Sequence, residues 1–211
     1  MNAQQEAEVY LAVAATCPLQ PLLNLVHDLS AVYPGTHIRF SRENMGGVVE
    51  RLLDEQADIV IASLDGVPTD QVEALPFIGV NIIPVAHPDY EPAKTSAVKS
   101  NQEMQNYVQV VVADSSQHQI KQSRDVLAGA LRWTVSDFSA KKEIILAKMG
   151  WGGVPEHLID EELASGQLVK LNIAGFTTRH SQLYKIRRKH YVGGIVAQSL
   201  WDSLQPIDQG I

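Results

Sequence analysis

Small polar side chains follow each of three expected strands in the first third of the chain. They are Thr16, Cys17, Asn44 and Ser63. A helix is expected to begin directly after Thr16 and Cys17, with Pro18 near its first position. The free N–H groups and the dipole of a helix amino end attract anions and carbonyl oxygens. The Thr16 hydroxyl is therefore a candidate to complete the oxygen shell of a ligand, and the competing interpretation is a threonine that only caps the helix.

Functional interpretations are also open for Cys17, Asn44 and Ser63. A helix amino end lowers the pKa of a thiol, so Cys17 is a candidate nucleophile or redox trigger, but no partner histidine can be placed beside it and packing is the competing interpretation. Asn44 is a candidate ligand contact or simply the N-cap of the next helix. Ser63 directly follows the run Asp58 to Ala62, and doubly wound sheets bind ligands beyond the carboxyl ends of their strands.

Patterns typical of enzymes and metal sites are missing from the sequence. It contains no GxSxG motif, no P-loop and no convincing pair of carboxylates. The glycines at 150–153 lack the GxGxxG spacing and do not follow an expected strand, which argues against a dinucleotide or phosphate loop. The seven histidines show neither HExxH nor a close pair at ligand spacing. We therefore expect no catalytic residues, no cofactor and no metal.

Alternating strands and helices are expected to position the first group of polar residues. The expected order is a buried strand at 9–14, a helix from Leu19 to Leu29 stopped by 33–35, a strand at 37–41, a helix carrying Val48 and Leu52, and a buried strand at 58–62. This order at short spacing predicts a doubly wound parallel sheet.

A second alternating round predicts a second α/β lobe. It comprises a strand at 107–113, a helix around 119–131, a strand at 132–135, a helix from Ser136 or Asp137 to Met149, a glycine bend at 150–155 leading into a helix that ends at Gly166, and a strand at 168–171. Trp151 is expected to cover the core of this lobe. Two extended stretches, 77–85 and 181–189, are expected to join the lobes as in hinged proteins. The basic residues at 185–190 are interpreted as a solvated edge face.

Composition limits the classes of function. The chain has 211 residues, is 45% hydrophobic and carries a formal charge of -7, whereas a domain that grips DNA by itself usually has a basic stripe. Its single cysteine excludes an internal disulfide and fits a reducing cytoplasm. We find no leader-like start and no apolar run of the ~18 residues that a membrane span needs. These features predict a cytoplasmic protein that contacts no membrane.

Several loose motifs, taken in their order and spacing, carry a family resemblance. The strongest are the stretch from Ser136 to Ile159, its continuation from Glu162 to Val169, the helix end at Tyr33-Pro34-Gly35 and the run from Leu53 to Ile61. From Val9 to Leu204 the chain resembles the effector-binding domain of LysR-type transcription regulators. The resemblance implies a type 2 periplasmic-binding-protein-like α/β fold, in which two Rossmann-like lobes enclose a central cleft and are joined by hinge crossovers. Lobe I is expected at 8–80 and 181–211, and lobe II at 81–180.

The resemblance also implies partners and ligand contacts. Regulators of this family respond to a small-molecule effector in the cleft and bind promoter DNA as homodimers or homotetramers. Their N-terminal winged helix-turn-helix is absent from this chain, so promoter DNA would be reached only through that missing domain. The implied ligand-binding set is Thr16, Cys17, Asn44, Ser63, Ser115, Ser116, His118 and Phe138. Ser115 to His118 are expected in lobe II, with solvent-exposed loop polarity as the alternative, and Phe138 would wall the pocket while Asp137 caps a helix.

Two other functions remain open at this point. A solute-binding protein of a transport system shares the fold but needs export, and an enzyme on the same scaffold would need a catalytic constellation that we do not find. The family's habit of antiparallel pairing further predicts that the helix Leu19–Leu29 contacts the helix Gln119–Leu131 of another subunit.

Overall fold

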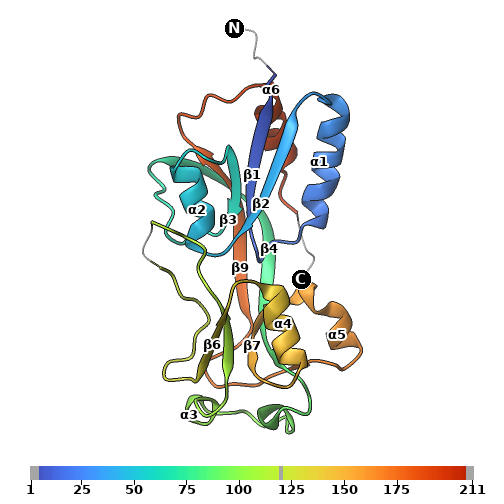
Figure 1. Ribbon diagram of the computed structural model, residues 1–211, viewed down its shortest axis with the longest axis vertical. Helices are drawn as coiled ribbons and strands as arrows, with labels where there is room; N and C mark the ends of the chain where they lie inside the picture. Colours follow the sequence, from blue (N-terminus) through green and yellow to red (C-terminus); the bar gives the residue numbers. More distant parts are fainter. Residues whose placement is uncertain (1–4, 119–120, 208–211) are drawn as a thin grey trace. The chain divides into compact units, whose positions relative to one another are not determined.

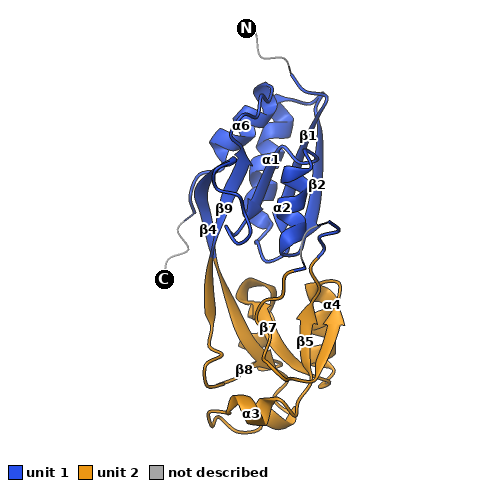
Figure 2. Ribbon diagram, turned by 90° about the vertical axis from the view of Figure 1, so that its left-hand side faces the viewer, with its two compact units in different colours: residues 1–79, 115–121, 182–211 blue, residues 80–114, 122–181 orange. Residues whose placement is uncertain are grey.

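The chain folds into two compact units. The computed structural model describes residues 5–118 and 121–207. Of the described residues, unit 1 takes 5–79, 115–118, 121 and 182–207, and unit 2 takes 80–114 and 122–181 (Figure 2). Two long strands, β4 (Val72–Ala86) and β9 (Arg179–Arg188), both labelled in Figure 1, each contain residues of both units. Among the described residues, no helix is both long and apolar enough to cross a lipid bilayer.

Unit 1 is built on three parallel strands. These are β1 (Glu8–Ala14), β2 (His37–Glu43) and β3 (Ile59–Ala62), in the order β2-β1-β3, with β9 antiparallel to β3. Helix α2 (Gly46–Leu53) packs on all three strands, while α1 (Gln20–Val32) packs on α6 (Ile195–Ser203). β1 is buried from Val9 onward, as its unbroken apolar run predicts for a central parallel strand. The predicted first round of strands and helices is therefore confirmed.

Unit 2 is a smaller mixed sheet with short helices. β5 (Gln109–Val112) runs parallel to β6 (Arg132–Val135) and β7 (Trp151–Pro155), and β4 runs antiparallel to β7 and β8 (Val169–Lys170). The helices are α3 (Asn101–Met104), α4 (Phe138–Leu146), α5 (Asp160–Ala164) and the 3-10 turns Glu91–Ala93 and Glu156–Leu158. Trp151 is buried edge-to-face against Phe176, which confirms its predicted place in the core.

The helix predicted around 119–131 is wrong. Residues 121–131 form no helix, and residues 119–120 lie outside the described residues. The buried Gln109 explains the difference, because its side-chain amide donates to the Asp125 carbonyl and accepts from the Leu127 N–H, both at 2.8 Å. Asp125 and Gly129 also have positive φ, which breaks helical geometry. The spacing of apolar residues cannot predict hydrogen bonds from a distant buried side chain to the backbone.

The predicted glycine bend at 150–155 is also wrong, because residues 151–155 form the buried strand β7. A Cβ on Gly152 would lie 2.6 Å from the Val110 carbonyl oxygen and 2.7 Å from Lys141 Cε. The glycine is therefore needed for the close approach of β7 to its neighbours.

The prediction of a solvated edge face at 185–190 is wrong for the strand residues 185–188, whereas Lys189 and His190, beyond the strand, are exposed. β9 has a paired strand on each side, β3 and β4. Lys185 is buried, its ammonium donates to the Trp201 carbonyl oxygen at 2.6 Å, and it lies 4.7 Å from the centroid of that indole ring. Helix α6 places Trp201 over this part of β9, which the alternation of β9 alone does not reveal.

Candidate functional site

The carboxyl ends of three parallel strands meet at one edge of the unit 1 sheet. Ala14 of β1 pairs with Glu43 of β2, and Val13 pairs with Ile61 of β3. The residues that follow these strands, among them Thr16, Asn44 and Ser63, therefore lie along the same edge. This is the edge at which doubly wound sheets bind ligands.

Thr16 lies in a half-buried turn rather than in the first turn of a helix. Helix α1 begins at Gln20, with Leu19 at the N-cap and Pro21 near the start, so the predicted helix start at Pro18 is wrong. The chain makes a turn before the helix begins, because the Cys17 N–H donates to the Ala14 carbonyl at 2.9 Å. The Ala15 N–H is also engaged, by the Glu43 carbonyl at 2.8 Å. The hydroxyl of Thr16 is thus a polar group that this turn can offer to a ligand.

A guanidinium lies over this turn and gives it a positive charge. Arg42, the penultimate residue of β2, donates from one terminal nitrogen to the carbonyl oxygens of Ala15 and Cys17, the second at 3.1 Å. Its side chain is exposed. A guanidinium has five donors in a planar fork, so Arg42 keeps the capacity to bind a carboxylate beside Thr16. Sequence analysis missed this residue, because the strand was expected to end at Ser41, whereas β2 continues to Glu43.

Cys17 is packed inside unit 1. It is 0% exposed, and its thiol donates to the Pro18 carbonyl oxygen at 3.4 Å. Burial raises the pKa of the thiol to about 12, and the nearby Arg42 opposes this only partly. Since the thiolate is the nucleophilic form, this geometry favours the packing interpretation over a reactive cysteine.

Asn44 contributes its backbone rather than a helix cap. The N-cap of α2 is Met45, which has a positive φ, and α2 has no side-chain cap, so the predicted N-cap at Asn44 is wrong. Instead the Asn44 N–H donates to the Ser115 hydroxyl at 2.9 Å, and its carbonyl accepts from the Gly47 N–H at 3.0 Å. The loop between β2 and α2 is therefore held by contacts with Ser115.

Ser115 joins this loop to a buried carboxylate. Its hydroxyl donates to Glu43 Oε2 at 2.7 Å, while Glu43 Oε1 accepts from Arg51 Nε at 2.8 Å. A Cβ on Gly47 would overlap the Ser115 hydroxyl and lie 3.1 Å from its Cβ, so only glycine admits this approach. Glu43 and Arg51 were missed because a paired charge on an otherwise buried element has no sequence signature.

Residues 115–118 pack with unit 1, whereas sequence analysis placed them in the second lobe. The Glu50 carboxylate explains this placement, because it accepts the N–H of Gln117 at 2.8 and 2.9 Å and the N–H of His118 at 2.9 Å. Ser116 is fully buried and its carbonyl accepts from the Lys121 ammonium. The His118 side chain is exposed. Ser115, Ser116 and His118 thus share a unit with Thr16 and Asn44.

The last two candidates have local roles. Ser63 is half-buried and its hydroxyl donates to Asp65 Oδ2 at 3.0 Å. Phe138 opens α4 in unit 2, where its half-buried ring lies 5.6 Å from the Lys141 ammonium and packs on the apolar core. Asp137 caps α4 as predicted, accepting from the Ala140 N–H at 2.8 Å, and this bond is the main cause of its lowered pKa.

Comparison with known proteins identifies relatives over nearly the whole chain. A family model described as the LysR substrate binding domain matches residues 2–207. The uncharacterized HTH-type transcriptional regulator YeeY of Escherichia coli K12 is 25% identical over 179 residues, which are 82% of this chain and 56% of YeeY. The chain therefore spans about half the length of this curated relative.

Solved structures agree with the family match. The regulatory domain of CcmR from Synechocystis PCC6803, in complex with 2-PG, has a TM-score of 0.70 at 19% identity and covers 94% of this chain and 96% of that chain. The effector binding domain of QuiR in complex with shikimate has a TM-score of 0.68 at 16% identity and covers 95% and 96%. These likenesses confirm the predicted type 2 periplasmic-binding-protein-like α/β fold.

Proposed function

The chain belongs to the LysR substrate-binding domain family, and from this premise we propose that it is the effector-sensing domain of a LysR-type DNA-binding transcription regulator. The match over residues 2–207 is the observation that carries the proposal. The matched part of YeeY is 56% of that regulator, so promoter contact is assigned to a part of the regulator outside the matched region. The net charge of -7 supports this assignment, because a domain that binds DNA by itself usually carries a basic surface.

The proposed effector is a small polar metabolite with a carboxylate or carbonyl oxygen. Thr16 offers a hydroxyl and Arg42 a guanidinium at the same turn, and both groups suit such an oxygen. CcmR is described with 2-PG and QuiR with shikimate, which supports small polar molecules as the effector class. The proposed contacts along the edge of unit 1 include the sequence candidates Asn44, Ser63, Ser115 and His118, and Phe138 is proposed for unit 2. Cys17 and Ser116 are 0% exposed, so we propose that they support this edge by packing and do not touch the effector.

The competing functions are less well supported. The match to a regulator family and to HTH-type regulators favours a sensor over a transport protein. The family is one of transcription regulators, which are not enzymes, and we propose no catalytic residues and no cofactor for this chain. We further propose that the domain acts in the cytoplasm and contacts no membrane, as expected for a regulator of transcription.

Self-association is part of the proposal. Helix α1 exposes Leu23 and Val32, two large apolar side chains that a second copy of the chain would cover in a homodimer or homotetramer. The partner helix expected at 119–131 does not form between 121 and 131, so the proposal rests on α1 alone.

A thermal-shift screen of metabolites tests the sensing function. A ligand at ~100 times its Kd adds about 2.7 kcal/mol to the stability of the folded state. For a chain of this size that raises the melting temperature by about 5–11 °C. The proposal expects small polar acids among the hits. A library of bacterial metabolites with no stabilising member would contradict it.

A further inference from the structure

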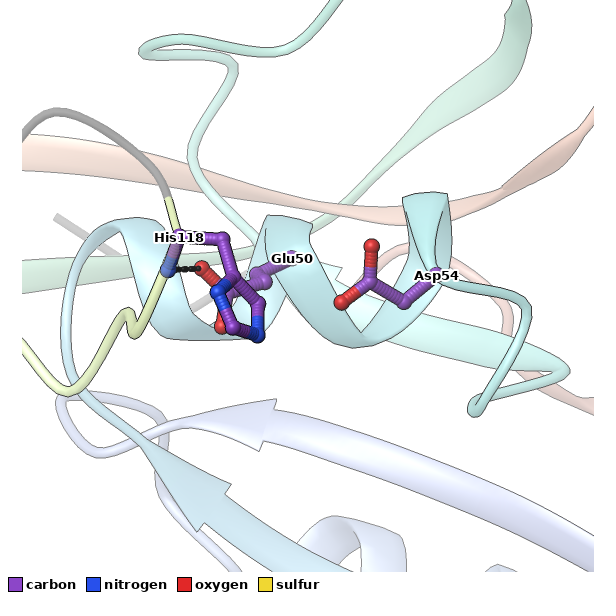
Figure 3. Close-up of side chains that lie close together, drawn as sticks. All are labelled: Glu50, Asp54 and His118. Atoms are coloured by element: carbon purple, nitrogen blue, oxygen red, sulfur yellow. Dashed lines mark hydrogen bonds between the residues drawn. The ribbon is translucent and has the colours of Figure 1, made fainter.

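Three side chains with metal-ligating atoms lie together at the end of α2. Glu50 lies in this helix, Asp54 is its C-cap, and His118 comes from the segment that packs against it (Figure 3). One ligand atom from each lies within 4.8 Å of the other two. Sequence analysis expected no metal site because no histidine has a partner at close spacing, and it had no means to see that residues 68 positions apart in sequence, Glu50 and His118, become neighbours.

Main-chain hydrogen bonds hold the three residues in place. Glu50 and Asp54 are four residues apart, so the periodicity of a helix puts them on one face, and the Asp54 N–H donates to the Glu50 carbonyl at 2.9 Å. The Glu50 carboxylate accepts the His118 N–H at 2.9 Å (Figure 3). These bonds, with those from the Gln117 N–H, orient the Glu50 carboxylate. The backbone of every ligand is thereby fixed before a metal binds.

The charge around the cluster suits a cation. Two carboxylates at this spacing on one helix repel each other, and a positive ion between them removes that cost. The guanidinium of Arg51, the nearest cation along the helix, is engaged by Glu43 Oε1 at 2.8 Å and by Gln56 Oε1 at 2.6 Å. Within residues 5–118 and 121–207, no ion pair involves Asp54.

We propose that Glu50, Asp54 and His118 form a binding site for a divalent transition-metal ion, with Zn²⁺ as the best match. Mg²⁺ and Ca²⁺ prefer oxygen ligands alone, whereas one imidazole with two carboxylates is a donor set for zinc and its neighbours. Three protein ligands leave a fourth position for water. Ligand atoms around a tetrahedral zinc ion are about 3.4 Å apart. The side chains of Asp54 and His118 are exposed, so rotation about their own bonds can bring the ligand atoms, which lie within 4.8 Å of one another, to this shorter spacing.

The ion would fasten a particular part of the chain. Residues 115–118 pack in unit 1, although the chain on both sides of this segment, up to 114 and from 122 onward, belongs to unit 2. The bonds from Gln117 and His118 to Glu50 already attach this segment to α2. A metal ion adds a side-chain link from His118 to the same helix, so it should slow hydrogen exchange at the Gln117 and His118 amides.

Metal titration of the purified chain, free of any affinity tag, tests the site. Calorimetry with Zn²⁺ should give one bound ion per chain, and Co²⁺ should give visible absorption bands of a low-coordinate site. Asp54→Asn and His118→Gln should each weaken Zn²⁺ binding by at least ~10-fold, since each removes a ligand. The fold is protected in both variants because both side chains are exposed. Glu50 is left unchanged because its carboxylate holds the backbone of the 117–118 segment.

Matched controls separate this site from general surface binding. Glu55→Gln removes an exposed carboxylate next to Asp54, and His180→Gln removes an exposed imidazole of unit 2, and neither should change the affinity. Equal Zn²⁺ affinity in wild type, Asp54→Asn and His118→Gln would overturn the proposal, as would the lack of a stoichiometric ion at millimolar Zn²⁺. The effector screen is run in EDTA, so a failure of the metal site leaves the proposed sensing function untouched.

Discussion

Replacing Ser115 by alanine tests the contact that attaches residues 115–118 to unit 1. The hydroxyl donates to Glu43 Oε2 at 2.7 Å and accepts from the Asn44 N–H at 2.9 Å. Ser115→Ala removes both bonds and leaves a buried carboxylate oxygen and a backbone donor without these partners. Arg51 still pairs with the other oxygen of Glu43, which limits the loss.

The expected cost follows from these two groups. An unsatisfied buried polar group costs about 1–3 kcal/mol, and the site is only part-buried, so water replaces some of the lost bonding and about 2 kcal/mol is expected. In a chain of this size each kcal/mol lowers the melting temperature by about 2–4 °C, which gives a drop of about 4–8 °C. Calorimetry measures it directly.

A matched serine supplies the control. The Ser203 hydroxyl also makes one short bond, to the Ser199 carbonyl at 2.8 Å, but on the exposed end of α6. Ser203→Ala should change stability by no more than ~0.5 kcal/mol. Hydrogen exchange at the Asn44 amide should accelerate in Ser115→Ala alone. If the two variants melt alike and the Asn44 amide stays protected in both, the assignment of Ser115 as the link between the loop and Glu43 is refuted.

Three further changes test other parts of the account. Cys17→Ser should leave the ligand response intact. The wild-type thiol should react slowly with disulfide reagents at pH 8, because burial raises its pKa to about 12. Loss of the ligand response on oxidation, restored by reductant, would contradict this. Burial lowers the pKa of Lys141 from 10.5 to about 8, against the pull of Asp125. Between pH 8 and pH 10.5 the unfolded state therefore binds more protons than the folded state, so the free energy of unfolding of the wild type rises with pH in this range. Below pH 8 the destabilisation caused by the buried ammonium is complete. Lys141→Met should be more stable at pH 7 by up to about 3 kcal/mol, with the gap closing by pH 10.5, as urea unfolding would measure; a pH-independent gap would refute it. Leu23→Glu should convert a dimer to monomer in light scattering while the neighbouring Asn24→Asp does not, and a monomeric wild type at tens of micromolar would count against self-association.

The sequence predicts the strands of unit 1 well because their signals are local. The run 9–14 is apolar without interruption, and residues 33–35 end the preceding helix, so neither element depends on a distant partner for its pattern. The errors arise where a distant side chain decides the structure. Gln109 captures the backbone of Asp125 and Leu127, and no spacing of apolar residues within 119–131 reveals that.

The same contrast between local signals and distant partners holds for the candidate site. Strand ends are local, which is why Thr16 and Asn44 could be placed at one sheet edge from the sequence and the parallel topology. The charged residues around them were missed, because Arg42 and Glu50 gain their partners from turns far along the chain. The helical spacing of Glu50 and Asp54 was visible, but a pair of carboxylates on a helix usually marks only a solvated face.

Isothermal titration of a screened effector tests the central claim most directly. The chain is titrated with the best small polar acid from the thermal-shift screen, beside Thr16→Val, Arg42→Gln and the control Thr69→Val, which alters an exposed threonine outside the sheet edge. The account predicts one site per chain, with affinity reduced ~10-fold or more in Thr16→Val and Arg42→Gln and unchanged in Thr69→Val, since each lost bond to a charged group is worth about 1.5–3 kcal/mol. Binding of equal strength in all four proteins would contradict the assignment of the effector to the turn after β1.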